Sequence, residues 1–215
     1  MYKKKPFFIV FEGIEGCGKS FQSKKLQINL KKKKIKTLLT REPGGTKSAE
    51  LIRNLILKDY FNKDIKEKFD KYTDTLLYLA SRNEHIKNKI KPALKNNKVV
   101  ICDRFTDSTL AYQVYGKKIN LNFINNIHKH ILSGIKPNIT FILKVSPKAS
   151  RKRLKKRKSR NRYDNFSQSF YAKAQNSFLK IAKKKKNYFV LDSSKNDNSL
   201  EKKIFEIVSK YLKIK

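Results

Sequence analysis

Eight residues near the N-terminus, Gly13–Ser20, read GIEGCGKS and fit the pattern G-x4-G-K-[ST] without a gap. They follow the continuous apolar run Phe7–Phe11, which is typical of a buried parallel strand, and they precede a helix-like segment from Lys19 to about Lys33. Glycines in such a turn let successive backbone N–H groups curl around phosphate oxygens, and the N-terminus of the following helix adds positive potential. The sequence therefore predicts a strand–loop–helix unit that binds the phosphates of a nucleoside triphosphate.

Short apolar segments alternate with amphipathic segments along the rest of the chain. Beyond Phe7–Phe11, buried strands are expected at Thr37–Thr40, Val99–Cys102, Ile139–Val145 and Tyr188–Leu191. Helices are expected at about 48–57, 73–89, 106–115, 120–132, from 146, 167–183 and 200–212. Ser48 and Thr73 are the expected N-caps of the second and third helices. Because no repeat or Pro/Gly/Ser-rich linker interrupts the chain, the sequence predicts a doubly wound P-loop α/β fold. This fold has a five-stranded parallel sheet flanked by helices, in a single domain over residues 1–215.

The chain is strongly basic, with 53 Lys and Arg against 17 Asp and Glu, a net charge of +36 and an isoelectric point near 10.2. Such a charge is typical of proteins that bind nucleic acid. Only nine of the 53 are arginine, however, and Lys, Asn and Ile, which all have A/T-rich codons, are abundant together. We favour compositional drift, which predicts nonspecific, salt-sensitive nucleic-acid binding, and keep a functional nucleic-acid surface as the alternative.

The cysteines and apolar stretches bear on the compartment. Cys17 and Cys102 are too few for a disulfide framework, and no segment resembles a secretory signal. The longest apolar stretches are far shorter than the roughly 20 residues of a membrane helix. We therefore expect a cytoplasmic protein that does not associate with membranes. His85, His128 and His130 lack the spacing of metal ligands, so no protein-bound metal is assigned to them.

Arginine positions are informative in a chain that uses lysine so heavily, because arginine offers a planar, forked set of donors. Arg41 and Arg104 follow the second and third predicted strands, whose carboxyl ends meet at the ligand-binding edge of such a sheet. Five of the nine arginines lie in 151–162. We expect Arg41 and Arg104 to form an anion pocket and residues 151–166 to form a mobile cationic lid. For the arginine-rich stretch 151–162, the alternative is a helix face that is simply exposed to solvent.

A triphosphate loop, a separate anion pocket and a cationic lid are together typical of nucleoside monophosphate kinases. A GTPase would carry an N-K-x-D element that reads the base, and the sequence has none. A nucleic-acid motor would usually need a larger chain. The residues therefore favour a kinase, and a P-loop nucleic-acid-binding protein is the alternative from another class.

Several ordered segments resemble the motifs of thymidylate kinases: FEGIEGCGKS at 11–20, TREPGGT at 40–46, LLYLASR at 76–82, DRF at 103–105 and STLAYQ at 108–113. The resemblance reaches 188–192 and so covers nearly the whole chain. Gly16 and the arginine-rich lid are similar to the bacterial branch, whereas Val114, Lys144 and Asn161 depart from the family pattern. The resemblance implies transfer of the γ-phosphoryl group of MgATP to dTMP, giving ADP and dTDP, by a homodimer. Another nucleoside monophosphate or deoxynucleoside kinase is the nearest alternative.

The resemblance, together with the loop motif, assigns the donor side of the site. The ATP-binding residues are expected to be Gly13, Ile14, Glu15, Gly16, Cys17, Gly18, Lys19, Ser20 and Phe21. Lys19 would reach the β- and γ-phosphates, and Ser20 and Asp103 would hold Mg²⁺ or its waters. The expected catalytic residues are Lys19, Asp103, Arg104, Arg153 and Arg157.

The resemblance also assigns the acceptor side. The expected dTMP-binding residues are Glu15, Arg41, Pro43, Tyr78, Arg82, Arg104, Ser108, Thr109, Tyr112 and Gln113. Arg41 and Arg104 would hold the 5′-phosphate, and Glu15 would lie beside the sugar and this phosphate. Tyr78 would stack on thymine, Arg82 would donate to its O4, Thr109 would bond the base edge, and Tyr112 would disfavour ribose.

Some of these residues have other interpretations. Tyr78 could be a core aromatic, and Thr109 could face solvent on a helix. Arg53 is expected to be a surface residue without a ligand. The Glu42–Pro43 bond is a candidate cis peptide.

Overall fold

The computed structural model describes residues 5–57, 68–156, 167–183, 185–195 and 197–214. Its central sheet consists of β1 (Phe7–Glu12), β2 (Thr37–Arg41), β3 (Val99–Asp103), β4 (Ile139–Lys144) and β5 (Tyr188–Asp192). These strands lie in the order β2-β3-β1-β4-β5, and every neighbouring pair is parallel. The predicted five-stranded parallel sheet is therefore confirmed.

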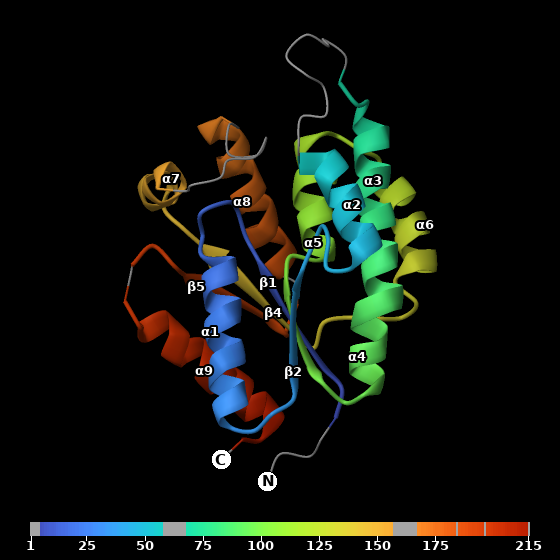
Figure 1. Cartoon of the computed structure of the whole chain (residues 1–215). Coiled ribbons are helices and arrows are strands. Elements are labelled where there is room, and N and C mark those ends of the chain that lie inside the picture. Colours follow the sequence, from blue (N-terminus) through green and yellow to red (C-terminus); the bar gives the residue numbers. More distant parts are fainter. Residues whose placement is uncertain (1–4, 58–67, 157–166, 184, 196, 215) are drawn as a thin grey trace.

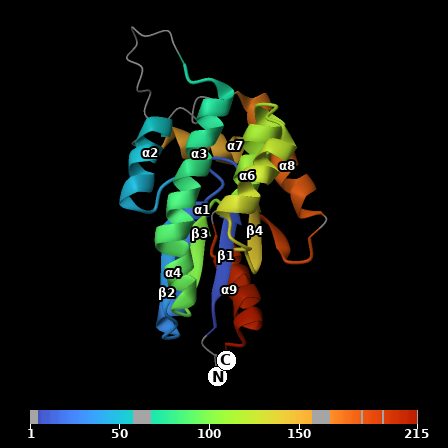
Figure 2. The same cartoon turned by 90° about the vertical axis from the view of Figure 1, so that its right-hand side faces the viewer.

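Helices cover both faces of this sheet (Figures 1 and 2). Within the described residues they are α1 (Lys19–Lys32), α2 (Lys47–Leu57), α3 (Lys71–His85), α4 (Lys91–Lys95), α5 (Thr106–Thr109), α6 (Leu121–Ile131), α7 (Pro147–Lys155), α8 (Gln168–Ala182) and α9 (Ser199–Leu212). Two π-helical segments, η1 (Ile86–Ile90) and η2 (Leu110–Gly116), continue α3 and α5. Figure 1 shows α1 and α9 on one side of the sheet, and α3, α4 and α6 on the other. No described helix is long and apolar enough to span a membrane.

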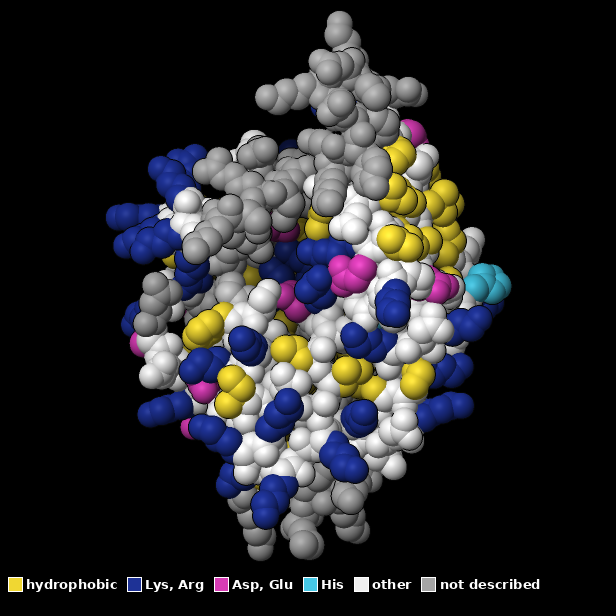
Figure 3. Space-filling view, viewed as in Figure 1, with side chains coloured by type: hydrophobic (Ala, Val, Ile, Leu, Met, Phe, Trp, Pro, Cys, Tyr) yellow, Lys and Arg dark blue, Asp and Glu magenta, His cyan; other side chains and the backbone are white. Residues whose placement is uncertain are grey.

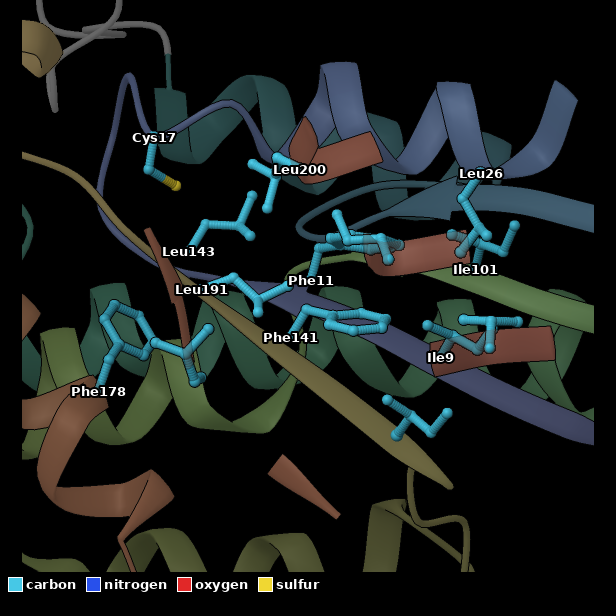
Figure 4. Packing of buried hydrophobic residues seen from close by; sticks show 14 of the residues in the cluster. Ile9, Phe11, Cys17, Leu26, Ile101, Phe141, Leu143, Phe178, Leu191 and Leu200 are labelled. Atoms are coloured by element: carbon cyan, nitrogen blue, oxygen red, sulfur yellow. The ribbon is translucent and has the colours of Figure 1, made fainter. Parts of the chain in front are cut away.

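Alternate side chains of β1 enter two hydrophobic clusters, one on each face of the sheet. Phe7, Ile9 and Phe11 join the cluster that includes residues of α1, α8 and α9, of which Figure 4 shows a part. In this cluster the ring of Phe11 stacks on Phe141 of β4, with 5.1 Å between centroids. A strand buried on both faces has this continuous apolar character, which explains why the run of phenylalanines predicts β1 so clearly.

Phe8 and Val10 of β1 point the other way, toward η1 and α4. Phe8 meets Phe105 edge to face, with 5.1 Å between ring centroids. Phe105 belongs to the segment between β3 and α5, so the second cluster anchors this segment beside the sheet. The core thus supports residues that follow the ends of the strands.

Two helix starts differ from the prediction. The side chain of Thr46, and not of Ser48, accepts from the N–H of Ala49 at the start of α2. Ser48 donates to Glu84 instead, at 2.9 Å. At α3 the cap is Asp70, which accepts from the N–H of Tyr72, so the expected cap at Thr73 was wrong. Each true cap lies two or three residues before the predicted one, outside the apolar periodicity.

The strand order brings three carboxyl ends together. β1 ends at the loop 13–18, β2 ends at Arg41, and β3 ends at Asp103 beside it in register. The N–H of Arg104 donates to the carbonyl of Phe11 at 2.9 Å, and the N–H of Glu42 donates to that of Asp103 at 2.9 Å. Segments far apart in the sequence therefore meet at one edge of the sheet, as ligand sites do in doubly wound folds.

Candidate active site

A cavity of about 330 Å³ opens at the carboxyl ends of β1, β2 and β3, and we call it the strand-end cavity. Its lining includes these residues assigned from the sequence: Glu15, Gly16, Gly18, Lys19, Ser20, Phe21, Arg41, Pro43, Tyr78, Arg82, Asp103, Arg104, Ser108, Thr109, Tyr112, Gln113 and Arg153. Five lining residues were not assigned: Glu42, Arg53, Leu57, Phe105 and Leu154. Figure 3 shows acidic and basic side chains side by side near the middle of this face. Gly13, Ile14 and Cys17 belong to the same loop but do not line the cavity.

The loop 13–18 wraps around the ammonium group of Lys19. Lys19 Nζ donates to the carbonyls of Gly13 and Ile14, at 3.0 and 2.8 Å. Gly13 has φ +139°, and a Cβ there would lie 2.6 Å from the Leu143 carbonyl oxygen of β4, so this position requires glycine. The lysine is thus held at the N-terminus of α1 with donors directed along the loop, where phosphate oxygens can replace the two carbonyls.

Ser20 and Asp103 form the part of the cavity that could hold a metal ion. The Ser20 hydroxyl donates to Asp103 Oδ2. Hydroxyl and carboxylate oxygens are ligands that Mg²⁺ prefers, and Mg²⁺ in nucleotide sites takes its remaining ligands from phosphates and water. Among the described residues, no group of three or more His, Cys, Asp or Glu is placed to hold a metal ion. The residues present therefore fit a magnesium ion that is shared with a bound nucleotide.

Arg104 is held at the cavity by three hydrogen bonds and a ring contact. Its backbone has φ +73°, and its Nη1 donates to Gly13 O and Ser108 Oγ at 2.9 and 3.0 Å. Nη2 pairs with Glu15 Oε1 at 2.7 Å, and the guanidinium carbon lies 5.3 Å from the centre of the Tyr112 ring. Burial opposes the charged form, but Glu15, Tyr112, Asp103 and Glu12 together hold the pKa of Arg104 well above its usual range. The site therefore keeps a fixed positive charge facing the loop.

Glu12 supports Arg104 from beneath, a role that the sequence did not reveal. Its buried carboxyl accepts from the N–H groups of Phe105 and Ser108, at 2.8 and 3.1 Å, and from the Ser108 hydroxyl at 2.6 Å. Burial, with the nearby charge of Asp107, raises the pKa of Glu12 to about 8. These bonds hold the segment after β3 in the conformation that directs Arg104 into the cavity.

Arg41 lies at the end of β2, where it is paired with an acid. Its Nη2 is 3.1 Å from both oxygens of Glu50, which also accepts from the N–H of Gly45 at 2.8 Å. Burial opposes ionisation of Glu50, but the Gly45 N–H and Arg41 together lower the pKa of Glu50. Half of the Arg41 side chain is exposed, at 54%. It can therefore turn toward a ligand in the cavity without a large desolvation cost.

Arg53 is not the surface residue that we expected. Its side chain is 25% exposed and lines the strand-end cavity, and its Nη1 donates to the Pro43 carbonyl at 2.6 Å. The Glu42–Pro43 bond before this carbonyl is cis, as the sequence suggested. Burial is the main cause that lowers the pKa of Arg53, and Arg41 adds to it. The restriction of arginine to nine positions was the signal that could have found this residue.

Arg82 of α3 is buried at the floor of the cavity. Its Nε donates to Glu42 Oε2 at 2.7 Å, and its Nη2 donates to the Phe105 carbonyl at 2.9 Å. Its Nη1 lies 2.8 Å from Thr109 Oγ1 and 2.8 Å from the Nε2 of His128. Thr109 is 2% exposed, so it does not face solvent. Arg82 and Thr109 therefore form one buried polar cluster that faces the cavity.

Glu42 joins this cluster to a second histidine. Its Oε1 accepts from His85 Nδ1 at 3.2 Å, and His85 Nε2 lies 2.6 Å from Thr40 Oγ1. Burial opposes ionisation, but Arg82 and His85 lower the pKa of Glu42. A Cβ on Gly45, at φ +99°, would lie 2.6 Å from the His85 ring, so the turn closes directly over the histidine. His85 and His128 thus have roles that sequence spacing did not show.

Residues 151–155 of the predicted lid belong to α7, which is attached to the loop 13–18. Arg153 Nη1 donates to Gly16 O at 3.2 Å, and its Nη2 donates to Ser193 O at 2.6 Å. The Ser150 hydroxyl donates to Glu15 O at 2.9 Å. Arg157 and the rest of the lid, 157–166, lie outside the described residues.

Comparison with known proteins identifies the relatives of this chain. A family model described as "Thymidylate kinase" matches residues 11–204. The thymidylate kinase of Aster yellows witches'-broom phytoplasma (strain AYWB) is 43% identical over 210 residues, which cover 96% of each chain. That of Prochlorococcus marinus (strain MIT 9301) is 43% identical over 204 residues, covering 93% of each.

A solved structure gives the same result at the level of the fold. The crystal structure of thymidylate kinase from Ehrlichia chaffeensis is 32% identical and superposes with a TM-score of 0.74. The likeness covers 95% of this chain and 99% of that one. With the family model matching most of its length, the chain belongs to the thymidylate kinase family.

Proposed function

We propose that the strand-end cavity transfers the γ-phosphoryl group of ATP to dTMP, giving ADP and dTDP. ATP-dependent phosphorylation of dTMP is the activity of the family to which the chain belongs. The observation that carries the assignment of this site is the position of Arg41 and Arg104. Arg41 ends β2, Arg104 follows the neighbouring strand β3, and both line one cavity with residues of the loop 13–18, which places the arginines where an acceptor phosphate would meet a triphosphate.

The donor side would be built from the loop 13–18 and the start of α1. The backbone N–H groups of the loop and Lys19 Nζ would bind the β- and γ-phosphates of ATP. Ser20 and Asp103 would hold Mg²⁺, which supplies neutralisation of phosphate charge when it is bound. Lys19 already has its ammonium group at the loop, so binding exchanges two carbonyl partners for phosphate oxygens.

On the acceptor side, Arg104 and Arg41 would bind the 5′-phosphate of dTMP. Both arginines now bond to carboxylates, Glu15 and Glu50, and a phosphate offers the same kind of oxygen acceptor. The acceptor phosphate is mostly a dianion at pH 7, since its second pKa is near 6, so no general base is needed. Positioning and charge stabilisation would then supply the catalysis.

The base would lie between Tyr78 and the buried cluster around Arg82. Arg82 would donate to thymine O4, and Thr109 and Gln113 would bond the base edge. The Tyr112 ring, fixed against Arg104 and bonded through its hydroxyl to Glu15 Oε2 at 2.7 Å, would fill the space of a ribose 2′-hydroxyl. These groups would therefore accommodate a deoxyribonucleotide with a thymine base better than a ribonucleotide.

We further propose that residues 151–166 act as a lid in a single domain over 1–215. Arg153 and Arg157 would contact the migrating phosphoryl group. The bonds from α7 to the loop 13–18 support a position for Arg153 beside the transfer zone. Closing such a lid would exclude water and so limit hydrolysis of ATP.

We also propose a homodimer. Leu51 of α2, Leu76 of α3 and Leu121 of α6 are exposed at 68%, 46% and 44%. A second copy of this chain is the partner that would cover these leucines. Light scattering at micromolar concentration tests the mass, and a monomer would contradict this proposal. A cytoplasmic location stays a prediction, which fractionation of the source cell would check.

The experiment that tests the function is a coupled ADP-release assay with MgATP and a panel of dTMP, dUMP, ribose TMP, dCMP, dGMP, AMP and CMP. Strong preference for dTMP is the expected result. Preference for another monophosphate would overturn the residues assigned to base recognition. If the protein is folded and binds ATP but phosphorylates none of these monophosphates, the proposed enzymatic activity is wrong. In the same preparation, nucleic-acid binding that disappears by about 200 mM salt would show that the +36 charge acts nonspecifically.

A further inference from the structure

His128 of α6 is a buried neighbour of Arg82 that no substrate assignment uses. α6 lies beside α3, as Figure 2 shows. The His128 side chain lies within this contact, since the residue is only 8% exposed. Its Nε2 lies 2.8 Å from Nη1 of Arg82, 46 residues away along the chain. A guanidinium has donors only, so the imidazole must accept through Nε2 and carry its proton on Nδ1.

The hydrogen bonds of Arg82 can be counted one by one. The Nε–H bonds Glu42, the two N–H groups of Nη1 bond Thr109 and His128, and one N–H of Nη2 bonds the Phe105 carbonyl. A guanidinium has five N–H groups, and no described residue accepts from the fifth, which is also on Nη2. The guanidinium also lies 5.4 Å from the centre of the Phe105 ring. Four bonds and one ring contact thus set the plane of the group and the direction of the remaining donor.

We infer that His128 is a positioning residue for base recognition, because its Nε2 holds Nη1 of Arg82 so that the fifth N–H points at the base. This inference rests on the proposed role of Arg82 in reading thymine O4. The guanidinium is planar and rigid, so fixing Nη1 also fixes Nη2. Without the His128 acceptor, a buried Nη1–H has no partner, and the group turns to find one.

The neutral form of His128 is what this arrangement requires. Burial is the main cause, and the charge of Arg82 the second, that lower the pKa of His128 to about 3. The acceptor lone pair on Nε2 is therefore present across the physiological range. Glu42 acts in the opposite direction but does not restore the ordinary pKa.

The direction of the fifth N–H of Arg82 distinguishes thymine and uracil from cytosine. Thymine and uracil present an O4 acceptor, whereas cytosine presents an N4 amino donor at the same place. A well-directed Arg82 donor therefore forms a hydrogen bond with dTMP and dUMP alike, whereas it meets a donor in dCMP and disfavours its binding. Loss of that direction weakens selection at position 4 and leaves selection for the 5-methyl group unchanged.

The test compares three variants with the wild-type enzyme. His128→Leu removes the acceptor with little change in volume, and His128→Gln places an amide oxygen near the position of Nε2. His130→Leu is the matched control, since His130 is exposed two residues along the same helix. For each protein, kcat and KM are measured with dTMP, dUMP and dCMP, together with the melting temperature.

We expect His128→Leu to lower the dTMP-to-dCMP ratio of kcat/KM by about tenfold or more while the dTMP-to-dUMP ratio stays constant. His128→Gln should recover most of this loss, and His130→Leu should match the wild type. A wild-type dTMP-to-dCMP ratio in His128→Leu, an equal loss for all three substrates, or failure of His128→Gln to recover would overturn the inference.

Two further comparisons keep the outcome clear. If His128→Leu does not fold, His128→Asn replaces it, because its shorter amide does not reach Arg82, and equal selectivity of the Asn and Gln variants would overturn the inference. A wild-type enzyme that does not distinguish dTMP from dCMP would contradict the proposed function itself. A selective wild-type enzyme whose selectivity is indifferent to residue 128 would contradict the inference alone.

Discussion

Arg104 and Glu15 form an ion pair at the edge of the strand-end cavity, with 2.7 Å between Nη2 and Oε1. The second oxygen of Glu15 accepts from the Tyr112 hydroxyl at 2.7 Å. The carboxylate therefore lies where an anionic group of a substrate would meet the arginine. Binding of the dTMP phosphate is then an exchange of acceptors at a guanidinium whose direction is already set, and little reorganisation accompanies the reaction.

Replacement of Arg104 should impair the reaction without unfolding the protein. Arg104→Lys keeps the charge but loses the forked donors that bond Gly13, Ser108 and Glu15, so kcat/KM for dTMP should fall by about 10²- to 10³-fold. Steady-state kinetics measures this loss. Lys129→Arg, the reverse exchange at an exposed position of α6, should have no effect. A value within twofold of the wild type for Arg104→Lys would exclude Arg104 from phosphate binding.

Sugar selectivity should depend on the Tyr112 ring and not on its hydroxyl. Tyr112→Ala opens space beside Arg104, so the ratio of kcat/KM for ribose TMP to that for dTMP should rise about tenfold. Tyr112→Phe keeps the ring and should keep the ratio, although it breaks the bond to Glu15. If the Phe variant relaxes the sugar preference as much as the Ala variant does, the ring is not what excludes the 2′-hydroxyl.

The buried His128 should make stability depend on acid pH. Its folded-state pKa of about 3 lies below the ordinary value of 6.5, so the unfolded chain binds more protons between these values. Stability from this group is present above pH 6.5 and is lost as pH falls toward 3, at up to about 1.4 kcal/mol per pH unit. Urea unfolding of the wild type and of His128→Gln at pH 6 and pH 4 measures the difference, which should shrink at the lower pH. A constant difference would show that His128 is not held neutral beside Arg82 and Glu42.

The buried Glu12 should lower the stability of the fold as pH rises, which is opposite to the effect of His128. Its pKa is raised from 4.5 to about 8 by burial and by Asp107, so the folded state binds more protons over this range. The wild type should therefore lose stability relative to Glu12→Gln as pH rises from 5 to 8, with the same limit of about 1.4 kcal/mol per pH unit. Melting temperatures of the two proteins across this range provide the measurement. A gap that does not change with pH would contradict the raised pKa.

Local patterns predicted the parts of this site that come directly after strands. The first strand and the phosphate loop were predicted from Phe7–Phe11 and Gly13–Ser20, because a glycine-rich turn of this pattern lies between a strand and a helix in such a fold. Arg41 and Arg104 were predicted to meet because parallel strands end at a common edge, and the structure brings both to one cavity.

Contacts between helices were harder to predict. His128 reaches Arg82 only through the packing of α6 against α3, and no spacing in the sequence encodes that distance. Arg53 was predicted to lie at the surface, although it lines the cavity. The sequence shows that it belongs to a helix but does not indicate which face of that helix meets the cavity. Thr46 and Asp70 show that a cap is decided by the first turn of backbone and not by the apolar pattern that follows.

The most direct test of the central claim is the balance of products. Wild-type protein is incubated with MgATP and dTMP, and all four nucleotides are separated and quantified over time. We expect ADP and dTDP in equal amounts from the wild type. Lys19→Met, which lacks the ammonium group at the phosphate loop, should form neither product at a measurable rate. Release of ADP without dTDP, or equal turnover by the Lys19 variant, would contradict phosphoryl transfer at this site.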